Sequence, residues 1–385
     1  MKFALLGADA ESLELARAVA ANHQYRLVWA GELGDARREV ERFAPTARLD
    51  DSWESLIAGD QVDAVIVAAS GDDDQAADRF RKLVQSGKPL IVTHPLHPSM
   101  LICYELDMIR QETRSPILPY APARWHPAVR RLVALFGADA SAPLGQLEQV
   151  VIERRLADRS PESVRRFFAR DVDLARLLAG ELTRLSAMAP TSEASGYANL
   201  GIQLSGSANV LIRYSVLPVE REPLGRITAV GAAGKAILLM PEQGTWTLDL
   251  AEGDDVEPES FPDWNPAAVG LEKLSRLIAG EEVRPNWVDA CRDIELADSI
   301  QRSLTKGRTV ELHYEDYSED GTFKGTMTSL GCALLWLAPL VLLGGIVLGQ
   351  MGLPIGDYVP HLLLGVFVIF LLLQLLRLAM PSKST

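Results

Sequence analysis

A chain of 385 residues with a 48% hydrophobic fraction is long enough for two domains with substantial cores. Its formal net charge of -13 argues against nucleic acid as a partner, because phosphates require a basic surface. The three cysteines stand far apart, and none has a Cys or His at zinc spacing, so we expect neither a disulfide framework nor a metal site.

The first third of the chain alternates short apolar segments with segments of helical spacing. The predicted strands lie at about 2–6, 26–30, 47–49, 63–69, 90–92 and 115–123. The segment 63–69, DAVIVAA, is of the kind that is buried on both faces of a sheet. Strands that alternate with helices at this spacing predict βαβ units, and hence an α/β fold with a Rossmann-like, doubly wound parallel sheet over residues 1–127.

One of these strands lies in the stretch GKPLIVTHPLHP, residues 87–98. It contains a turn at Gly87, a short aliphatic strand and an abrupt exit through Thr93-His94-Pro95. Ligands of open parallel sheets bind at the carboxyl ends of the strands. His94 is therefore a candidate reacting group.

From about residue 144 the pattern changes to many strands punctuated by Gly and Pro. The predicted strands lie near 146–154, 184–188, 197–205, 209–216, 225–231, 235–240 and 245–250, with helices at about 161–179, 264–279 and 287–304. Runs of strands after a βαβ half predict a second α+β domain with a mostly antiparallel sheet, which we place at residues 128–313.

The last part of the chain contains two long uncharged intervals, from Lys324 to Asp357 and from Asp357 to Arg377. Each exceeds the roughly 18 apolar residues that mark a membrane-spanning helix. We therefore predict a transmembrane helical hairpin, with two buried helices of a soluble domain as the alternative. The predicted segments are a linker at 314–327, two helices within 328–380 (about 328–350 and about 360–380) and a tail at 381–385.

Basic residues near the ends of these helices predict the orientation of the hairpin. Lys324 precedes the first helix, Arg377 and Lys383 come at the end of the second, and the connecting loop has no Lys or Arg. By the positive-inside tendency we expect a two-pass membrane protein whose N-terminal globular part and C-terminal tail face the cytoplasm.

The loop after the first strand is where a dinucleotide phosphate would bind. The motif G-x-G-x-x-G is required there, whereas this chain has Gly7-Ala8-Asp9-Ala10-Glu11-Ser12, with only the first glycine. Asp9 would instead cap the helix and occupy the anion site itself, with cofactor binding as the alternative. Glu32 is the acid near the end of the second strand that could receive a ribose hydroxyl.

Over residues 1–313 the order of elements and several motifs resemble the Gfo/Idh/MocA oxidoreductases, the glucose–fructose oxidoreductase and inositol dehydrogenase family. The motifs are DSWESLIAGDQVDAVIVAAS, SGKPLIVTHPL, PARWHPAVRRL, FARDVDLARLLAG, GRITAVGAAGKAILL and DACRDIELADSIQRSLTKGRTVEL. The resemblance implies NAD(P) binding, redox chemistry at a sugar or polyol hydroxyl, and a homo-oligomer. The implied cofactor-binding positions are Gly7, Asp9, Ser12, Glu32, Ala69, Ser70 and Thr93.

The catalytic positions that the resemblance implies carry other residues here. The substrate-binding lysine of the family's Glu-Lys-Pro triplet is His94, and the Asp and His of the second-domain helix are Arg166 and Arg170. An arginine stays protonated and has no acceptor, so it cannot serve as an acid/base. We therefore predict a ligand-binding or scaffold pseudo-enzyme. The alternative is an active NAD(P)-dependent sugar or polyol dehydrogenase tethered to the membrane.

The two arginines also suggest a binding role. Arg166 and Arg170 are four residues apart and share a helix face, which favours an anionic, sugar-type ligand held by guanidinium groups. The alternative is a solvated helix in which Glu162 pairs with Arg166. Two further residues are candidates for the same ligand, Arg124 and His126. In the simpler interpretation His126 only begins a helix beside Pro127.

Overall fold

The computed structural model describes residues 1–59, 61–70, 74–137, 142–190, 197–206, 208–250 and 257–312, together with Gln350. The chain divides into two compact units, Met1–Leu312 and His313–Thr385. The predicted linker, hairpin and tail lie outside the described residues, apart from Gln350. Among the helices that are described, none combines the length and the apolar character needed to cross a bilayer.

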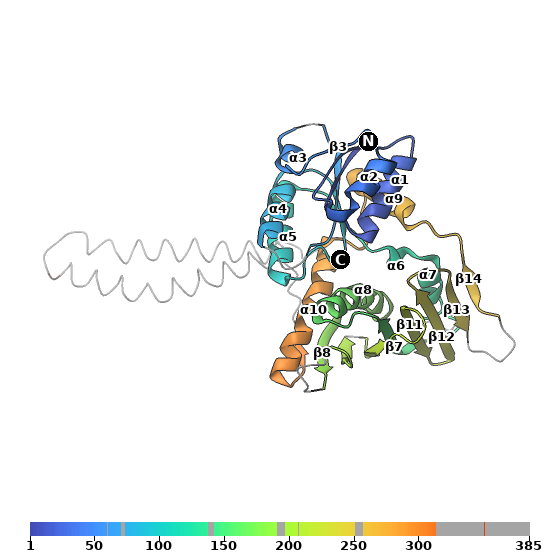
Figure 1. Ribbon diagram of the computed structural model, residues 1–385. Helices are drawn as coiled ribbons and strands as arrows, with labels where there is room; N and C mark the ends of the chain where they lie inside the picture. Colours follow the sequence, from blue (N-terminus) through green and yellow to red (C-terminus); the bar gives the residue numbers. More distant parts are fainter. Residues whose placement is uncertain are drawn as a thin grey trace. The chain divides into compact units, whose positions relative to one another are not determined.

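The first sheet has six parallel strands in the order β3-β2-β1-β4-β5-β6 (Figure 1). The strands are β1 (Lys2–Leu6), β2 (Arg26–Gly31), β3 (Arg48–Leu49), β4 (Ala64–Val67), β5 (Leu90–Thr93) and β6 (Ile117–Tyr120). The strand order reverses between β1 and β4, and this switch point is where open α/β sheets bind ligands. The prediction of a Rossmann-like parallel sheet is confirmed.

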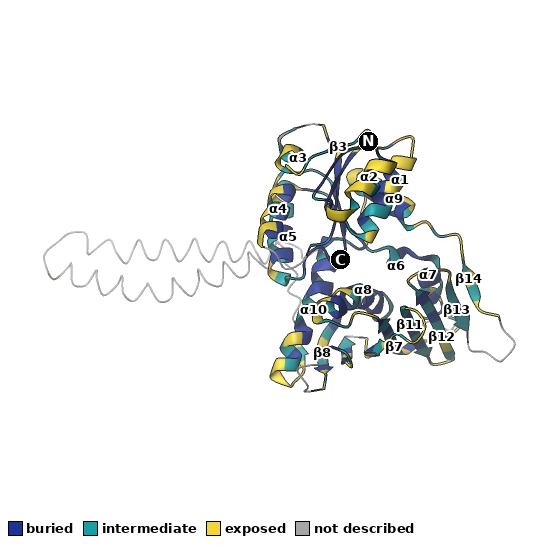
Figure 2. Ribbon diagram, viewed as in Figure 1, coloured by how far each residue is buried: buried dark blue, intermediate teal, exposed yellow. Residues whose placement is uncertain are grey.

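Helices cover both faces of this sheet, and strands β4, β5 and β6 are buried throughout (Figures 1 and 2). The helices of the first part of the chain are α1 (Ala10–Ala21), η1 (Gly34–Ala36), α2 (Arg37–Phe43), α3 (Glu54–Ala58), α4 (Asp74–Gln85), α5 (Met100–Thr113), α6 (Pro122–Trp125) and α7 (Pro127–Ala134). One face packs Leu15 and Val19 of α1, and the other packs Phe80 of α4 and Leu106 of α5. Helix α6 shortens the predicted strand 115–123, since a proline fits the first turn of a helix.

The second sheet has nine strands in the order β14-β13-β12-β11-β7-β10-β9-β8-β15. They are β7 (Leu147–Leu156), β8 (Leu182–Met188), β9 (Gly201–Gly206), β10 (Leu211–Pro218), β11 (Leu224–Gly231), β12 (Gly234–Pro241), β13 (Trp246–Leu250), β14 (Glu259–Phe261) and β15 (Val310–Glu311). Strand β7 pairs in parallel with β10 and antiparallel with β11. The prediction of a mostly antiparallel second sheet is therefore confirmed.

Three long helices connect the two sheets. Helix α8 (Pro161–Ala179) follows β7 and begins at the N-cap Ser160. Helix α10 (Trp287–Lys306) lies against both α8 and α5. Helix α9 (Pro266–Ile278) returns to the first sheet, where Ala267, Leu271 and Leu274 join the core that contains α1 and β6. The predicted boundary at residue 127 thus separates the strands of the two sheets, but the chain crosses it again at α9.

The contact between α9 and β6 generates a test. A Cβ atom added at Gly270 would lie 2.7 Å from Cε2 of Tyr120, whose side chain is fully buried. We expect Gly270→Ala to lower the free energy of unfolding by about 1–3 kcal/mol. The expected direction is opposite to the usual one, because replacing glycine by alanine in a helix interior normally raises the free energy of unfolding by about 1 kcal/mol. Denaturant unfolding followed by tryptophan fluorescence measures the change.

The matched control is Gly201→Ala in β9, because an added Cβ there meets no atom within 4 Å. We expect this substitution to change stability by no more than about 0.5 kcal/mol. Equal stability of the two variants would contradict the close packing of α9 on β6.

Candidate functional site

The carboxylate of Asp9 binds donors from three elements at the carboxyl edge of the first sheet. Its Oδ1 accepts a hydrogen bond from the backbone N–H of Ser12 at 2.7 Å, and the hydroxyl of Ser12 accepts from the N–H of Asp9 at 2.9 Å. Its Oδ2 accepts from the N–H of Ala69 at 2.9 Å and from the hydroxyl of Thr93 at 2.8 Å. The predicted N-cap is confirmed, and the same carboxylate also joins the loop after β4 to the end of β5.

These residues do not fit the phosphates of a dinucleotide. The first turn of α1 offers its N–H groups to an anion, and the Asp9 carboxylate already takes that role. A pyrophosphate would meet a negative charge where the motif requires a glycine. Gly7 keeps its turn conformation, with a φ of 76°, and a Cβ there would lie 3.0 Å from Cβ of Ala68. The surviving glycine is therefore explained by its turn conformation and its close packing on Ala68, without a cofactor.

Glu32, the candidate ribose acceptor, follows β2 with a φ of 54°. Its carboxylate forms an ion pair with the guanidinium group of Arg79. Its backbone N–H donates to Oδ1 of Asp51 at 3.0 Å. The carboxylate of Glu32, the second group that the resemblance implies for cofactor binding, is thus already paired with Arg79 of the protein.

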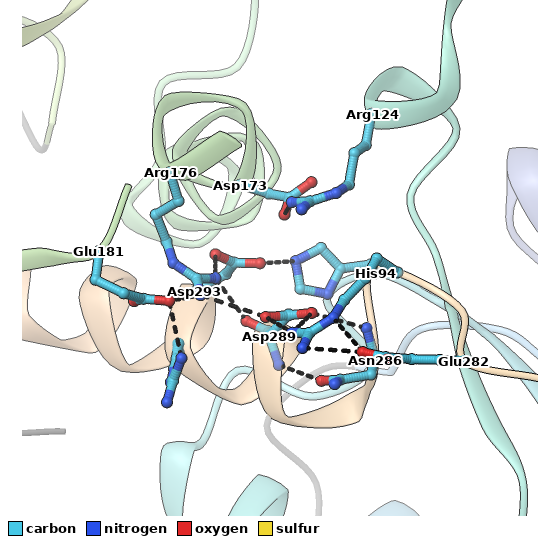
Figure 3. Close-up of polar contacts among 11 residues, drawn as sticks. His94, Arg124, Asp173, Arg176, Glu181, Glu282, Asn286, Asp289 and Asp293 are labelled. Atoms are coloured by element: carbon cyan, nitrogen blue, oxygen red, sulfur yellow. Dashed lines mark hydrogen bonds and ion pairs between the residues drawn. The ribbon is translucent and has the colours of Figure 1, made fainter. Parts of the chain in front are cut away.

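His94 is buried at the end of β5, with 3% of its surface exposed. Its Nε2 lies 3.6 Å from Oδ2 of Asp293 on α10 (Figure 3). Burial, together with the positive charges of Arg170 and Arg176, lowers the pKa of the imidazole to about 3, so His94 is neutral at pH 7. The side chain faces an interior carboxyl group, where a ligand in solution does not reach it.

Asp293 belongs to a buried network built around Arg176 of α8. The guanidinium group donates to Oδ1 of Asp293 at 2.7 Å, to the carbonyl oxygen of Asp289 at 3.0 Å and to Glu181 at 2.9 Å (Figure 3). Burial, together with the negative charge of Asp173, raises the pKa of the Asp293 carboxyl group well above its usual value. Sequence reasoning missed Asp293. The available signal was the pair of aspartates four residues apart on α10.

Two aspartates of α8, Asp171 and Asp173, also form ion pairs with arginines. Asp173 pairs with Arg124, and Asp171 pairs with Arg154 of β7 (Figure 3 shows the first pair). Asp171, Asp173 and Arg154 are each less than a tenth exposed. Arg124, a candidate for binding an anionic ligand, is therefore held by a carboxylate of its own chain.

The two arginines at the implied catalytic positions have different surroundings. Arg170 donates to the carbonyl oxygen of His94 at 2.7 Å and to the carboxylate of Glu11 at 2.8 Å. Arg166 is exposed and has no ion pair within 4.0 Å among the described residues, so the expected pair with Glu162 is not observed there. Arg166 instead lines a cavity of about 120 Å³. The guanidinium group of Arg170 is therefore bound by groups of the protein itself, whereas that of Arg166 faces a cavity.

His126 caps helix α7, as the simpler interpretation predicted. Its Nδ1 accepts a hydrogen bond from the N–H of Ala128 at 3.2 Å. Its ring stacks on Trp246 of β13 at 4.1 Å between centroids and meets Trp264 edge-on at 5.2 Å. Burial lowers the pKa of the ring to about 4. These contacts make His126 a packing residue between α7 and the second sheet.

Solved structures with a similar fold include dehydrogenases and other oxidoreductases. A putative myo-inositol dehydrogenase from Sinorhizobium meliloti 1021 is 22% identical with a TM-score of 0.64, over 81% of this chain and 100% of that one. A myo-inositol dehydrogenase from Corynebacterium glutamicum ATCC 13032 is 22% identical with a TM-score of 0.63, over 82% and 99%. GenD2 from gentamicin A biosynthesis, solved in complex with NAD, is 17% identical with a TM-score of 0.66, over 82% and 97%.

No family model and no curated protein matches the sequence. The structural likeness shows the fold, which is the fold expected from the resemblance to the Gfo/Idh/MocA oxidoreductases.

The contact between Glu11 and Arg170 predicts a pH dependence of stability. Burial raises the pKa of the Glu11 carboxyl group from 4.5 to about 7, although Arg170 opposes the shift. The folded state then binds the proton more tightly than the unfolded state, so stability is highest at low pH and falls as the pH rises from 4.5 towards 7. The full shift corresponds to about 3 kcal/mol. The effect should be smaller, because 20% of the Glu11 side chain is exposed.

We expect Glu11→Gln to flatten this dependence, so that the variant gains stability relative to the wild type between about pH 5 and about pH 8. Thermal unfolding midpoints across that range measure it. Glu39→Gln removes an exposed carboxylate from α2 and should keep the wild-type slope. Parallel curves for all three proteins would show that Glu11 does not carry the effect.

Proposed function

We propose that this protein is a Gfo/Idh/MocA-like homologue that no longer performs hydride transfer with a nicotinamide cofactor and acts as a ligand-binding or scaffold protein. One observation carries the proposal. The carboxylate of Asp9 accepts hydrogen bonds from Ser12, Ala69 and Thr93 at the place where the fold would hold the cofactor phosphates.

The surroundings of the implied catalytic positions support the same conclusion. A dehydrogenase needs a group within hydrogen-bond reach of the substrate hydroxyl to take its proton. His94 is buried against Asp293, and Arg170 is held by Glu11. Arg166 is accessible but stays protonated, so it cannot accept a proton.

A second candidate function is an active NAD(P)-dependent dehydrogenase. It is favoured by the fold shared with GenD2, whose structure contains NAD. The two functions differ in whether the protein binds a reduced nicotinamide cofactor, and this difference can be measured directly.

We expect the full-length protein in detergent to show no saturable binding of NADH or NADPH up to about 1 mM. We expect Asp9→Gly to bind one of them at least about tenfold more tightly, because the substitution removes a like charge and frees the N–H groups of α1. Asp9→Ser keeps a capping oxygen without the charge and covers the case in which the glycine variant is unstable. Cofactor fluorescence gives the binding curves.

Asn265→Gly is the matched control, because Asn265 caps α9 by accepting from the N–H of Ala268 at 3.0 Å. This substitution removes the cap of another helix, and we expect the binding of NADH and NADPH to remain as in the wild type. Micromolar binding of NADH or NADPH by the wild type would overturn the proposal and favour the dehydrogenase.

We further propose that residues 328–380 anchor the protein in a membrane by two spanning helices, with the globular part and the tail in the cytoplasm. The uncharged intervals on either side of Asp357 support the spans. Lys324, Arg377 and Lys383 support the orientation.

Reporter fusions test this topology. A reporter that works only in the cytoplasm should be active when fused after Thr385, and a reporter that works only outside should be active when fused after Gly356, in the predicted loop between the spans. The reverse pattern would overturn the orientation. Release of the chain from membranes by alkaline washing would overturn the anchor.

A further inference from the structure

A cavity of about 120 Å³ lies beside the carboxyl edge of the first sheet. Its walls come from the loops after β4 and β5 and from helices α8 and α10. The residues that matter for its chemistry are Ser70, Pro95, Arg165, Arg166, Ala169 and Ile294. The wall is thus apolar at Pro95, Ala169 and Ile294, and its charged groups are two guanidinium groups and the carboxylate of Glu162.

The two guanidinium groups of this cavity are available to a ligand. Arg166 is exposed and has no ion pair within 4.0 Å in the part of the chain that the structure describes. Arg165 makes one hydrogen bond, from its Nε to the carbonyl oxygen of Pro161 at 3.3 Å. The Oγ of Ser70 is buried and has no hydrogen-bond partner among the described residues.

The charge of the cavity is positive. Glu162 is the one acidic residue in its lining, against Arg165 and Arg166. All three lie in the first two turns of α8, where the helix dipole also favours a negative charge. By contrast, four neighbouring arginines are paired with carboxylates of the chain, namely Arg124, Arg154, Arg170 and Arg176.

We propose that this cavity binds the phosphate or carboxylate group of a small molecule, with the guanidinium groups of Arg166 and Arg165 binding the anion. The inference rests on the proposed ligand-binding function and names the class of ligand. A cavity of about 120 Å³ has room for an anionic group and the atoms attached to it. Guanidinium groups suit both anions, because they form two parallel hydrogen bonds with either.

Calorimetric titration of the full-length protein in detergent tests the site. The probes are inorganic phosphate, glucose 6-phosphate, gluconate and, as the neutral comparison, glucose. We expect at least one anion to bind with a dissociation constant below about 1 mM while glucose does not. Binding should weaken as salt is added. A preference for the phosphates or for gluconate then identifies the anion.

Three variants locate the binding on α8. Arg166→Ala and Arg165→Ala should each weaken binding about tenfold, because each removes a charge-assisted hydrogen bond. Glu162→Gln should strengthen it a few-fold by removing the opposing charge. Arg213→Ala, which removes an exposed arginine from β10, is the matched control and should bind as the wild type does. Arg166 is exposed, and unchanged thermal midpoints would show that its variant is folded.

The proposal is overturned if no anion binds better than glucose, or if the Arg165 and Arg166 variants both keep wild-type affinity. Either result leaves the absence of cofactor binding untouched, since that is measured separately with NADH and NADPH. Conversely, micromolar binding of NADH would refute the proposed function even if an anion binds at Arg166. The two failures are therefore distinguishable.

Discussion

The organisation of the candidate site depends on a single carboxylate, that of Asp9. Its bonds to Ser12, Ala69 and Thr93 join the start of α1, the loop after β4 and the end of β5. Hydrogen bonds to a charged acceptor contribute about 1.5–3 kcal/mol each, so this junction is rigid. The same junction has two effects on binding. It takes the donors that phosphates would need, and it holds the loop at Ala69 and Ser70 that forms a wall of the cavity.

The charged residues of helix α8 form two groups, one in buried ion pairs and one at a cavity. Its inward side carries Asp171, Asp173 and Arg176, which are buried and paired across to β7, α6 and α10. Removing one partner of such a buried pair lowers the free energy of unfolding by about 3–5 kcal/mol, so these residues serve the stability of the fold. Its first two turns carry Arg165 and Arg166, which face a cavity. Helix α8 thus packs against the rest of the protein on one side and presents two guanidinium groups to a cavity near its start.

Sequence reasoning succeeded where the cause is local. Helix α8 agrees with its predicted range of about 161–179, and the structure shows local signals at both ends, with Ser160 as N-cap, Pro161 in the first turn and Gly180 as C-cap. The cap at Asp9 was predicted for the same kind of reason. The pairs His94–Asp293 and Glu11–Arg170 were not foreseen, because their members lie far apart in the chain and no periodic pattern records which helix meets which loop. Strand β14 has only three residues, too few to show an alternating pattern.

The return of α9 to the first sheet has a consequence for how the chain folds. Ala267, Leu271 and Leu274 of this helix, followed by Val283, complete the core on one face of the first sheet. These residues emerge from the ribosome after every strand of the second sheet except β15. A nascent chain that ends near residue 127 would therefore leave Tyr120 uncovered, and domain-by-domain folding during synthesis is disfavoured. The core on this face of the first sheet is therefore completed only after α9 has been synthesised.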